Sequence, residues 1–144
     1  VSIERVTFPE VVAGGRLFAM ATDDYWIDAG NPALYLQANL DLLDGTRRDH
    51  PCIGVHRGAH VDSSATISGS IVADGATVAA GATITDSVLL PSAVVEQGAV
   101  VANSVVMGRI GARANVTQSV FGLHGRAASG ERVSGEYRPS ADST

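Results

Sequence analysis

Residues 58–122 constrain the fold most, because this stretch repeats itself. Aliphatic residues return every five or six positions, and three such phrases make one round. Equivalent residues lie 17 positions apart from Val61 to Val78 and from Val78 to Val95, and 15 positions apart from Val95 to Ile110. Self-similarity with a six-residue spacing is typical of a parallel β-helix. The sequence therefore predicts a mainly β fold with about four coils of hexapeptide repeats.

A small residue stands two positions before each repeated aliphatic residue. These small residues are Ala59, Ala65, Ser70, Ala76, Ala82, Ser87, Ala93, Ala99, Ser104, Gly108, Ala114 and Ser119. Residues i and i−2 of a strand point to the same face, so both members of each pair should face the interior. We expect the small residues at the corners of a triangular coil, and Asn103 and Asn115 at turns where φ can be positive.

The repeat weakens after Phe121. Ala127 and Val133 continue the spacing, but Glu131 stands where a small residue is expected. This pattern predicts a degenerate last turn that caps the stack, as repeat proteins require. We place the β-helix at residues 53–135 and a disordered polar tail at residues 136–144.

Charge and composition argue against several classes of protein. A net charge of −5 argues against a nucleic-acid binder, which should carry a basic face. Cys52 is the only cysteine, so neither a disulfide framework nor a cysteine zinc site is expected. No run approaches the roughly 18 apolar residues of a membrane span, and no signal peptide opens the sequence. The expectation is a cytoplasmic protein that binds neither nucleic acid nor membrane.

Residues 1–48 lack the repeat and indicate a small α/β unit. The pattern predicts a first helix that stops at Gly14, strands at residues 16–22 and 25–27, and a second helix that begins at Pro32. Such a unit lies near the size below which a lone core rarely holds. We interpret it as the last part of a larger domain whose beginning is missing, although a GTG start codon would also explain the initial valine.

The second helix carries the clearest local signals of this unit. Asn31 is the expected N-cap, ahead of the proline at the first helical position. Leu36, Leu40 and Leu43 follow at helical spacing and predict a buried stripe, and Gly45 should end the helix.

The order of these segments resembles a known family of enzymes. Residues 25–32, Y-W-I-D-A-G-N-P, resemble the W-x-D-x-G-T-P segment near the end of the catalytic domain of sugar-nucleotide pyrophosphorylases. S-I-E-R before this segment and Y-L-Q-A-N-L-D-L-L after it are similar to the last helices of that family. A β-helix directly after the last helix is the arrangement of mannose-1-phosphate guanylyltransferases and ADP-glucose pyrophosphorylases, and S-I-E-R with G-R-L-F-A favours the former. The resemblance also implies a left-handed coil, which the spacing alone does not indicate.

The resemblance implies two site residues. In the complete enzyme Asp28 would be a magnesium ligand, and Glu4 would accept hydrogen bonds from sugar hydroxyls. Magnesium prefers carboxylate oxygens together with waters and substrate phosphates, and a helix N-terminus favours the phosphate. From the residues alone, Asp28 as a turn or helix cap and Glu4 as a solvated carboxylate remain open alternatives.

No catalytic residue is assigned, because several parts of the family's active site are absent from the sequence. These are the nucleotide-binding loop G-x-G-T-R-L-x-P-L-T, the partner aspartate of the metal site and the lysine that reaches the sugar phosphate. Phosphoryl-type transfer depends on such clamps, so the chain alone should be inactive.

Three functions remain open from the sequence. The first is the C-terminal part of a sugar-1-phosphate nucleotidyltransferase, which in the parent family converts GTP and mannose 1-phosphate to GDP-mannose and pyrophosphate. Its β-helix would serve oligomerisation or regulation, and its partners would be the missing N-terminal domain and further copies of the chain, held through the β-helix or an exposed apolar face. The second is a non-catalytic assembly module that pairs with a separate catalytic chain.

The third function is a hexapeptide acyltransferase, which would need a coil histidine as base. The four histidines are His50, His56, His60 and His124. They lie in the linker, beside the first coil or near the cap, so solvated turn histidines are the favoured interpretation. Trp26 and Tyr35 should pack where residues 1–48 meet the rest of their domain.

Overall fold

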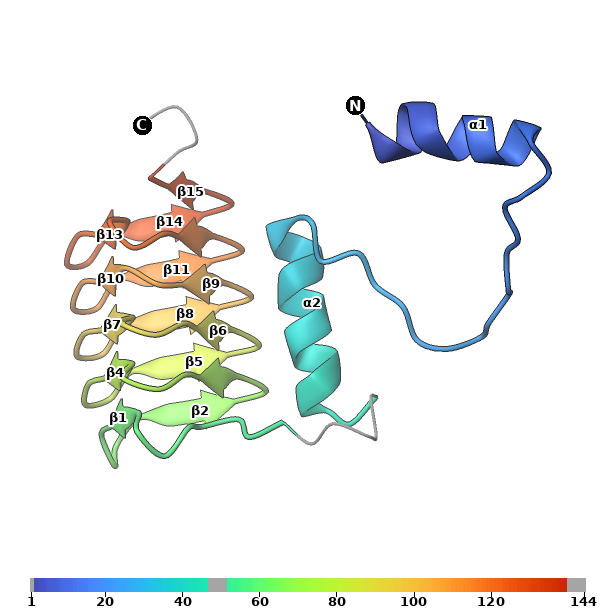
Figure 1. Cartoon of the computed structure of the whole chain (residues 1–144). Coiled ribbons are helices and arrows are strands. Elements are labelled where there is room, and N and C mark those ends of the chain that lie inside the picture. The colour runs from blue at the N-terminus through green and yellow to red at the C-terminus, as the bar shows by residue number, and fades with distance from the viewer. Residues whose placement is uncertain (1, 47–51, 140–144) are drawn as a thin grey trace.

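The computed structural model describes residues 2–46 and 52–139. The strands form a parallel β-solenoid of about five turns, and a few helices precede it (Figure 1). It fits the predicted left-handed β-helix. The first sheet consists of β1 (His60–Val61), β4 (Thr77–Val78), β7 (Val94–Val95), β10 (Arg109–Ile110) and β13 (Arg126–Ala127). The second consists of β2 (Thr66–Ser68), β5 (Thr83–Thr85), β8 (Val100–Ala102), β11 (Asn115–Thr117) and β14 (Arg132–Ser134). The third consists of β3 (Ile71–Val72), β6 (Val88–Leu89), β9 (Val105–Val106), β12 (Val120–Phe121) and β15 (Tyr137–Arg138).

The register of the sheets reproduces the sequence repeat. Val61 pairs with Val78, Val78 with Val95, and Val95 with Ile110, all in parallel. Ile110 then pairs with Ala127 in the fifth coil, which is the degenerate turn expected after Phe121. The repeat therefore sets which residue stacks on which along the whole solenoid.

The interior of the solenoid contains the predicted aliphatic and small residues. Val78, Ile84 and Leu89 are at most 1% exposed, and Ala82 is fully buried. A β-carbon on Gly108 would lie 2.0 Å from the carbonyl oxygen of Gly125 in the next coil, closer than real atoms approach. The small residues of the repeat are thus required by the narrow corners.

At one corner the small residue is always serine in the first four coils, and its hydroxyl has a specific function. Ser104 Oγ donates to the carbonyl of Ala102 at 2.7 Å and accepts from the backbone N–H of Ser119 at 3.1 Å. The same pattern links the buried serines in order, namely Ser70, Ser87, Ser104 and Ser119. The ladder ends where Ser119 accepts from the N–H of Glu136. The sequence interpretation treated these residues only as small.

The two asparagines differ in their backbone conformation. Asn103 has φ of 48°, which confirms a turn with positive φ. Asn115 lies inside β11, so its assignment to such a turn was wrong. The turn of that coil uses Gln118 instead, with φ of 49°. Because the interval before this coil is two residues shorter, the turn falls at position 118 rather than 17 residues after Asn103.

The last coil is closed by a charged residue at an inward-facing position. Arg138 lies in the column of Phe121, with its guanidinium carbon 5.8 Å from the centre of that ring. It bonds Glu131 and Glu136, each at 2.8 Å. The solenoid therefore continues to Arg138, beyond the predicted boundary at residue 135, while residues 140–144 of the predicted tail lie outside the described residues.

The N-terminal segment is helical at both ends and irregular between them. A π-helical turn, η1 (Ile3–Thr7), continues into α1 (Phe8–Ala13), which ends at Gly14 as predicted. The strands expected at residues 16–22 and 25–27 are absent from the described structure, and that prediction was wrong. A strand requires a neighbouring backbone, and none of the described segments pairs with this one. Figure 1 shows residues 2–30, here called the N-terminal arm, set apart from the solenoid.

Candidate functional site

Helix α2 (Pro32–Leu43) begins and ends where the sequence predicts. The Asn31 side chain accepts a hydrogen bond from Leu34 N–H at 3.0 Å, and Pro32 occupies the first turn. Beyond the last turn, Gly45 has φ of 83°. These caps satisfy backbone groups that a helix otherwise leaves open at its ends.

The helix lies along the third sheet of the solenoid (Figure 1). Its first turn faces Val120 and Tyr137 of the last coils, and Leu43 at its other end faces Gly54 before the first coil. Twelve residues of helix measure about 18 Å, and four strand spacings measure about 19 Å. The helix therefore spans almost the full height of the stack.

The face under α2 is apolar on its outer side. Val72, Leu89, Val106 and Phe121 point inward, so the residues before them point outward. This outward column, here called the helix-docking face, consists of Ile71, Val88, Val105, Val120 and Tyr137. Val88 is 1% exposed, whereas Val100, which points outward from the second sheet, is 38% exposed. The cover supplied by α2 explains the difference.

The sequence interpretation missed this face, although a signal for it was present. The third phrase of each round carries two adjacent large apolar residues: Ile71-Val72, Val88-Leu89, Val105-Val106 and Val120-Phe121. Adjacent strand residues point to opposite faces, so a repeated apolar pair predicts a sheet that is buried on both sides.

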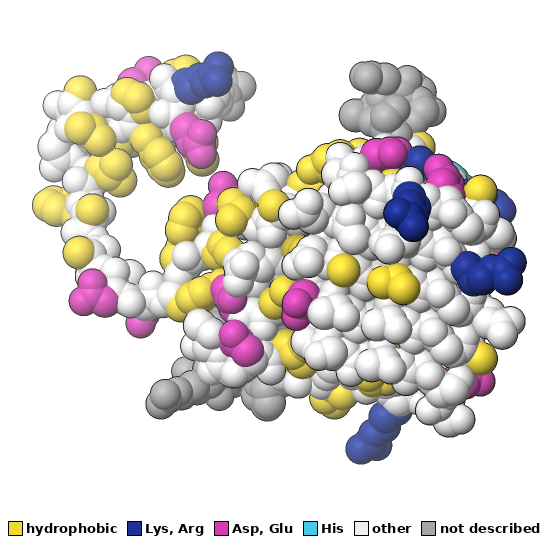
Figure 2. Space-filling view, turned by 180° about the vertical axis from the view of Figure 1, so that it is seen from behind, with side chains coloured by type: hydrophobic (Ala, Val, Ile, Leu, Met, Phe, Trp, Pro, Cys, Tyr) yellow, Lys and Arg dark blue, Asp and Glu magenta, His cyan; other side chains and the backbone are white. Residues whose placement is uncertain are grey.

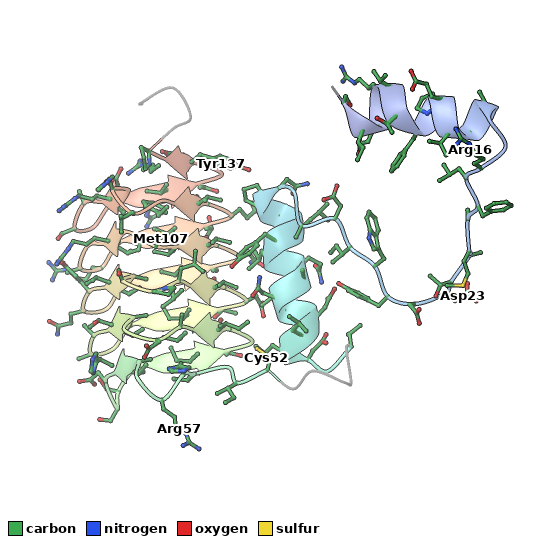
Figure 3. All side chains as sticks on the ribbon, in the orientation of Figure 1. Arg16, Asp23, Cys52, Arg57, Met107 and Tyr137 are labelled. Atoms are coloured by element: carbon green, nitrogen blue, oxygen red, sulfur yellow. The ribbon has the colours of Figure 1, made fainter. Side chains whose placement is uncertain are left out.

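The cover over the helix-docking face is incomplete. Leu36, Leu40 and Leu43 are only half-buried, so the stripe predicted to be buried is partly open. A cavity of about 250 Å³ lies beside Leu36 and Val105, and a larger one of about 660 Å³ lies beside Leu40 and Ile67. Both follow the seam between the helix and the solenoid. Tyr137, at the exposed end of the seam, is labelled in Figure 3.

The chain segment before α2 is tied to the helix by a hydrogen bond from Tyr25. The hydroxyl of Tyr25 donates to the carboxylate of Asp41, and Gln37 donates to the same carboxylate at 2.6 Å. Tyr35 is half-buried on the helix and Trp26 is 81% exposed, and their expected contact with the rest of the domain stays a prediction. Tyr25 is thus held against the helix, while its neighbour Trp26 stays in solvent.

Asp28 and Glu4 occupy different parts of the N-terminal arm. Asp28 is exposed, and its Oδ1 accepts a hydrogen bond from Gly30 N–H at 2.9 Å. This is the geometry of a turn residue, which is the alternative role of Asp28. Glu4 is exposed on η1. In Figure 1 η1 is well separated from the start of α2, so the described structure does not bring the two carboxylates together.

The described residues do not by themselves fit a magnesium site at Asp28. Residues 2–46 and 52–139 contain no group of three or more histidine, cysteine or acidic side chains placed to hold a metal ion. Asp28 supplies one carboxylate, and magnesium sites use one or two carboxylates together with waters and phosphates. Any such site would need further groups from outside these residues.

The described histidines form no catalytic arrangement with a buried base. His56, His60 and His124 are exposed. His56 Nδ1 lies 3.2 Å from Asp74 Oδ1, and both side chains are largely in solvent. His60 points outward from β1. His50 lies outside the described residues.

Hydrophobic side chains gather on the N-terminal arm (Figure 2). The most exposed are Phe18 at 89%, Met20 at 90% and Trp26 at 81%. Contiguous exposed apolar surface of this kind commonly marks a contact with another protein surface. None of the helices among the described residues has both the length and the apolar run that a membrane crossing requires.

A triangular parallel solenoid with a six-residue repeat places the chain among the hexapeptide-repeat β-helix proteins. Residues 53–137 match the family described as GlmU-like, C-terminal hexapeptide, and the chain belongs to that family.

Curated relatives agree with the resemblance seen in the sequence. Mannose-1-phosphate guanylyltransferase 1 of Arabidopsis thaliana is 33% identical over 73 residues, which are 51% of this chain and 18% of the relative. The mannose-1-phosphate guanylyltransferase catalytic subunit beta of Xenopus tropicalis is 38% identical over 50 residues, 35% of this chain and 14% of the relative. The chain thus spans less than a fifth of the length of these relatives. The similarity supports kinship with the nucleotidyltransferases.

Among solved structures, the acetyltransferase domain of PglB from Neisseria gonorrhoeae FA1090 is similar, with 20% identity and a TM-score of 0.35. The match covers 69% of this chain and 58% of that one. This likeness is too distant to inform function.

Proposed function

We propose that the chain is the C-terminal portion of a sugar-1-phosphate nucleotidyltransferase of the mannose-1-phosphate guanylyltransferase type. The complete enzyme would form GDP-mannose and pyrophosphate from GTP and mannose 1-phosphate with magnesium. The observation that carries the proposal is the sequence similarity to guanylyltransferases, in a chain whose last helix, α2, leads into the solenoid and packs on it.

The solenoid would serve oligomerisation or regulation of that enzyme. Helix α2 would fix the catalytic domain relative to the solenoid, because it is tied to the preceding segment through Asp41 and to the helix-docking face through its leucines.

The N-terminal arm would pack against the catalytic domain in the complete enzyme. Its apolar residues would then leave solvent, and Asp28 would contribute one carboxylate to a magnesium site completed by that domain. Glu4 would accept hydrogen bonds from the sugar hydroxyls. The support for both roles is the family resemblance and the exposure of both carboxylates.

The test is GDP-mannose formation by the purified chain, alone and mixed with a separately expressed guanylyltransferase catalytic domain. We expect no turnover from the chain alone and magnesium-dependent turnover from the mixture. Asp28→Ala should abolish the activity of the mixture. Asp74→Ala removes another exposed carboxylate, on the solenoid, and should not change the activity of the mixture. Activity of the chain alone would show that the nucleotide-binding loop, the partner aspartate and the lysine are not needed for catalysis, and would overturn the proposal.

A second candidate is a non-catalytic module that assembles with a separate catalytic chain. The relative from Xenopus tropicalis is named a catalytic subunit, which motivates this alternative. It predicts that the chain binds and activates a catalytic partner that is already complete, and that Asp28→Ala leaves the activity of the pair unchanged. The outcome of the Asp28 substitution therefore separates the two candidates. A hexapeptide acyltransferase is less favoured, and saturable binding of acyl-coenzyme A would revive it.

A further inference from the structure

One corner of the solenoid is shorter than its neighbours. Between the third and first sheets, the chain uses four residues at 90–93 and four at 122–125, but only Met107 and Gly108 in the coil between them. This two-residue difference accounts for the 15-residue interval in the repeat. The short corner is recessed between two longer ones, and a notch of about 150 Å³ lies there, next to Ser92, Gly108 and Leu123. Met107 is labelled in Figure 3.

Two arginines line the notch. Arg109 and Arg126 are register partners on adjacent strands of the first sheet, and both point outward. Their backbones are therefore about 4.8 Å apart. Like charges on directly opposite residues of neighbouring strands repel each other, and an anion bound between them would relieve that repulsion.

The carboxylates of the described chain neutralise only one of these two charges. Arg109 forms an ion pair with Glu96, whose other oxygen accepts from Ala112 N–H at 3.0 Å. The Arg126 side chain has no hydrogen bond or ion pair within residues 2–46 and 52–139; only its carbonyl is used, by Arg138 at 3.0 Å. One positive charge at the edge of the notch is thus left without a counter-ion from those residues.

The backbone of the short corner adds a hydrogen-bond donor. Gly108 is buried, yet its N–H has no partner among the residues that the structure describes, while its carbonyl accepts from Val94 N–H at 3.0 Å. Buried backbone donors are nearly always paired with protein, water or ligand. A β-carbon on Gly108 would collide with the backbone of Gly122 and Gly125 in the next coil, so this short corner requires glycine.

We propose that this notch binds the phosphate group of a small molecule. Arg109 and Arg126 would each donate to phosphate oxygens, and Gly108 N–H would donate from the floor. Guanidinium groups match phosphate geometry because their planar fork of N–H donors can contact two oxygens at once. The site lies on the solenoid itself and does not depend on the proposed function of the complete enzyme.

The experiment is a titration of the full chain with inorganic phosphate at constant ionic strength, followed by amide and arginine side-chain NMR. Pyrophosphate, GDP and mannose 1-phosphate are the further arms, and they identify the source of the phosphate group. We expect saturable shifts of Gly108 N–H and of the side-chain signals of Arg109 and Arg126. Sodium chloride at the same ionic strength should leave these signals in place.

Substitutions distinguish specific phosphate binding in the notch from nonspecific attraction of anions to arginines. Arg126→Gln should weaken binding by about tenfold or more, since a charge-assisted bond is lost. Val94→Glu places a carboxylate in register with Arg109 and should abolish binding while the fold is kept. Arg132→Gln, an exposed arginine on the second sheet, is the matched control and should change nothing. Equal weakening by Arg126→Gln and Arg132→Gln, or shifts that follow ionic strength alone, would overturn the proposal.

Discussion

The solenoid and the N-terminal arm use apolar residues in opposite ways. In the solenoid each inward residue stacks on its equivalent in the next coil, and Val95, Val101 and Ile110 are fully buried. On the arm the apolar residues have no such neighbours, and Phe18 is 89% exposed. The repeat supplies its own packing partners, whereas a single segment must find them elsewhere. Hydrophobicity alone therefore does not decide which residues stabilise this chain.

The largest expected effect is the removal of a core residue from the solenoid. Ile84→Ala should lower the free energy of unfolding by about 2–5 kcal/mol, because it leaves a cavity between coils. Trp26→Ala on the arm should change it by no more than about 0.5 kcal/mol. Denaturant unfolding of both variants measures the contrast, and equal effects would remove the distinction between the two regions.

Enlarging a corner residue should also destabilise the solenoid. Ala82 is fully buried in a column with Ala65 and Ala99, so Ala82→Leu should cost about 1–3 kcal/mol or more by overpacking. Thr85→Ile, at a partly exposed position in the same coil, should stay within about 0.5 kcal/mol. Thermal unfolding compares the two, and similar tolerance at both positions would contradict the narrow-corner account.

The serine ladder allows a sharper test of the solenoid interior. Ser104→Ala keeps the small size but leaves the buried N–H of Ser119 without its acceptor, at a cost of about 1–3 kcal/mol. Ser68→Ala, on an exposed position of β2, is the control. If Ser104→Ala had the wild-type stability, size alone would explain serine at this corner.

The smallest expected effect concerns the closing residues of the last coil. The hydrogen bond from Arg138 and that from Ala128 N–H lower the pKa of Glu131, and the bonds to Glu131 and Glu136 raise the pKa of Arg138. A carboxyl group whose pKa is lowered by folding contributes stability above its unfolded pKa, and loses it as the pH falls through the folded value. Stability should therefore decline in acid, and Glu131→Gln should weaken that decline. Unfolding midpoints measured from neutral pH to about pH 3 test this, and an unchanged pH profile would argue against the pair.

The sequence predicted the solenoid well because the repeat carries its own register. Knowing that Val78 stacks between Val61 and Val95 requires only the spacing. The strands expected at residues 16–27 failed for the converse reason, since strand formation depends on a partner that the local sequence does not specify. The helix-docking face lay in the same repeat and was missed because inward and outward residues were not considered together.

The candidate site could be predicted less completely than the fold. Asp28 and Glu4 were identified by resemblance to a family. Their proposed roles require groups beyond the described residues, which the local sequence does not specify. The notch between the first and third sheets arises from the 15-residue interval in the repeat. The interval shows that one corner is two residues shorter, but the notch forms only because longer corners lie on both sides of it in the structure.

Helix α2 changes how the stack can come apart. A solenoid in which each coil touches only its neighbours behaves as a one-dimensional array, which can open from either end one coil at a time. Here a single helix lies beside residues near both ends, from Tyr137 to Gly54. Opening a terminal coil therefore also costs contacts with a rigid element anchored at the other end. The helix therefore couples the coils, and we expect them to unfold cooperatively rather than one at a time from the ends.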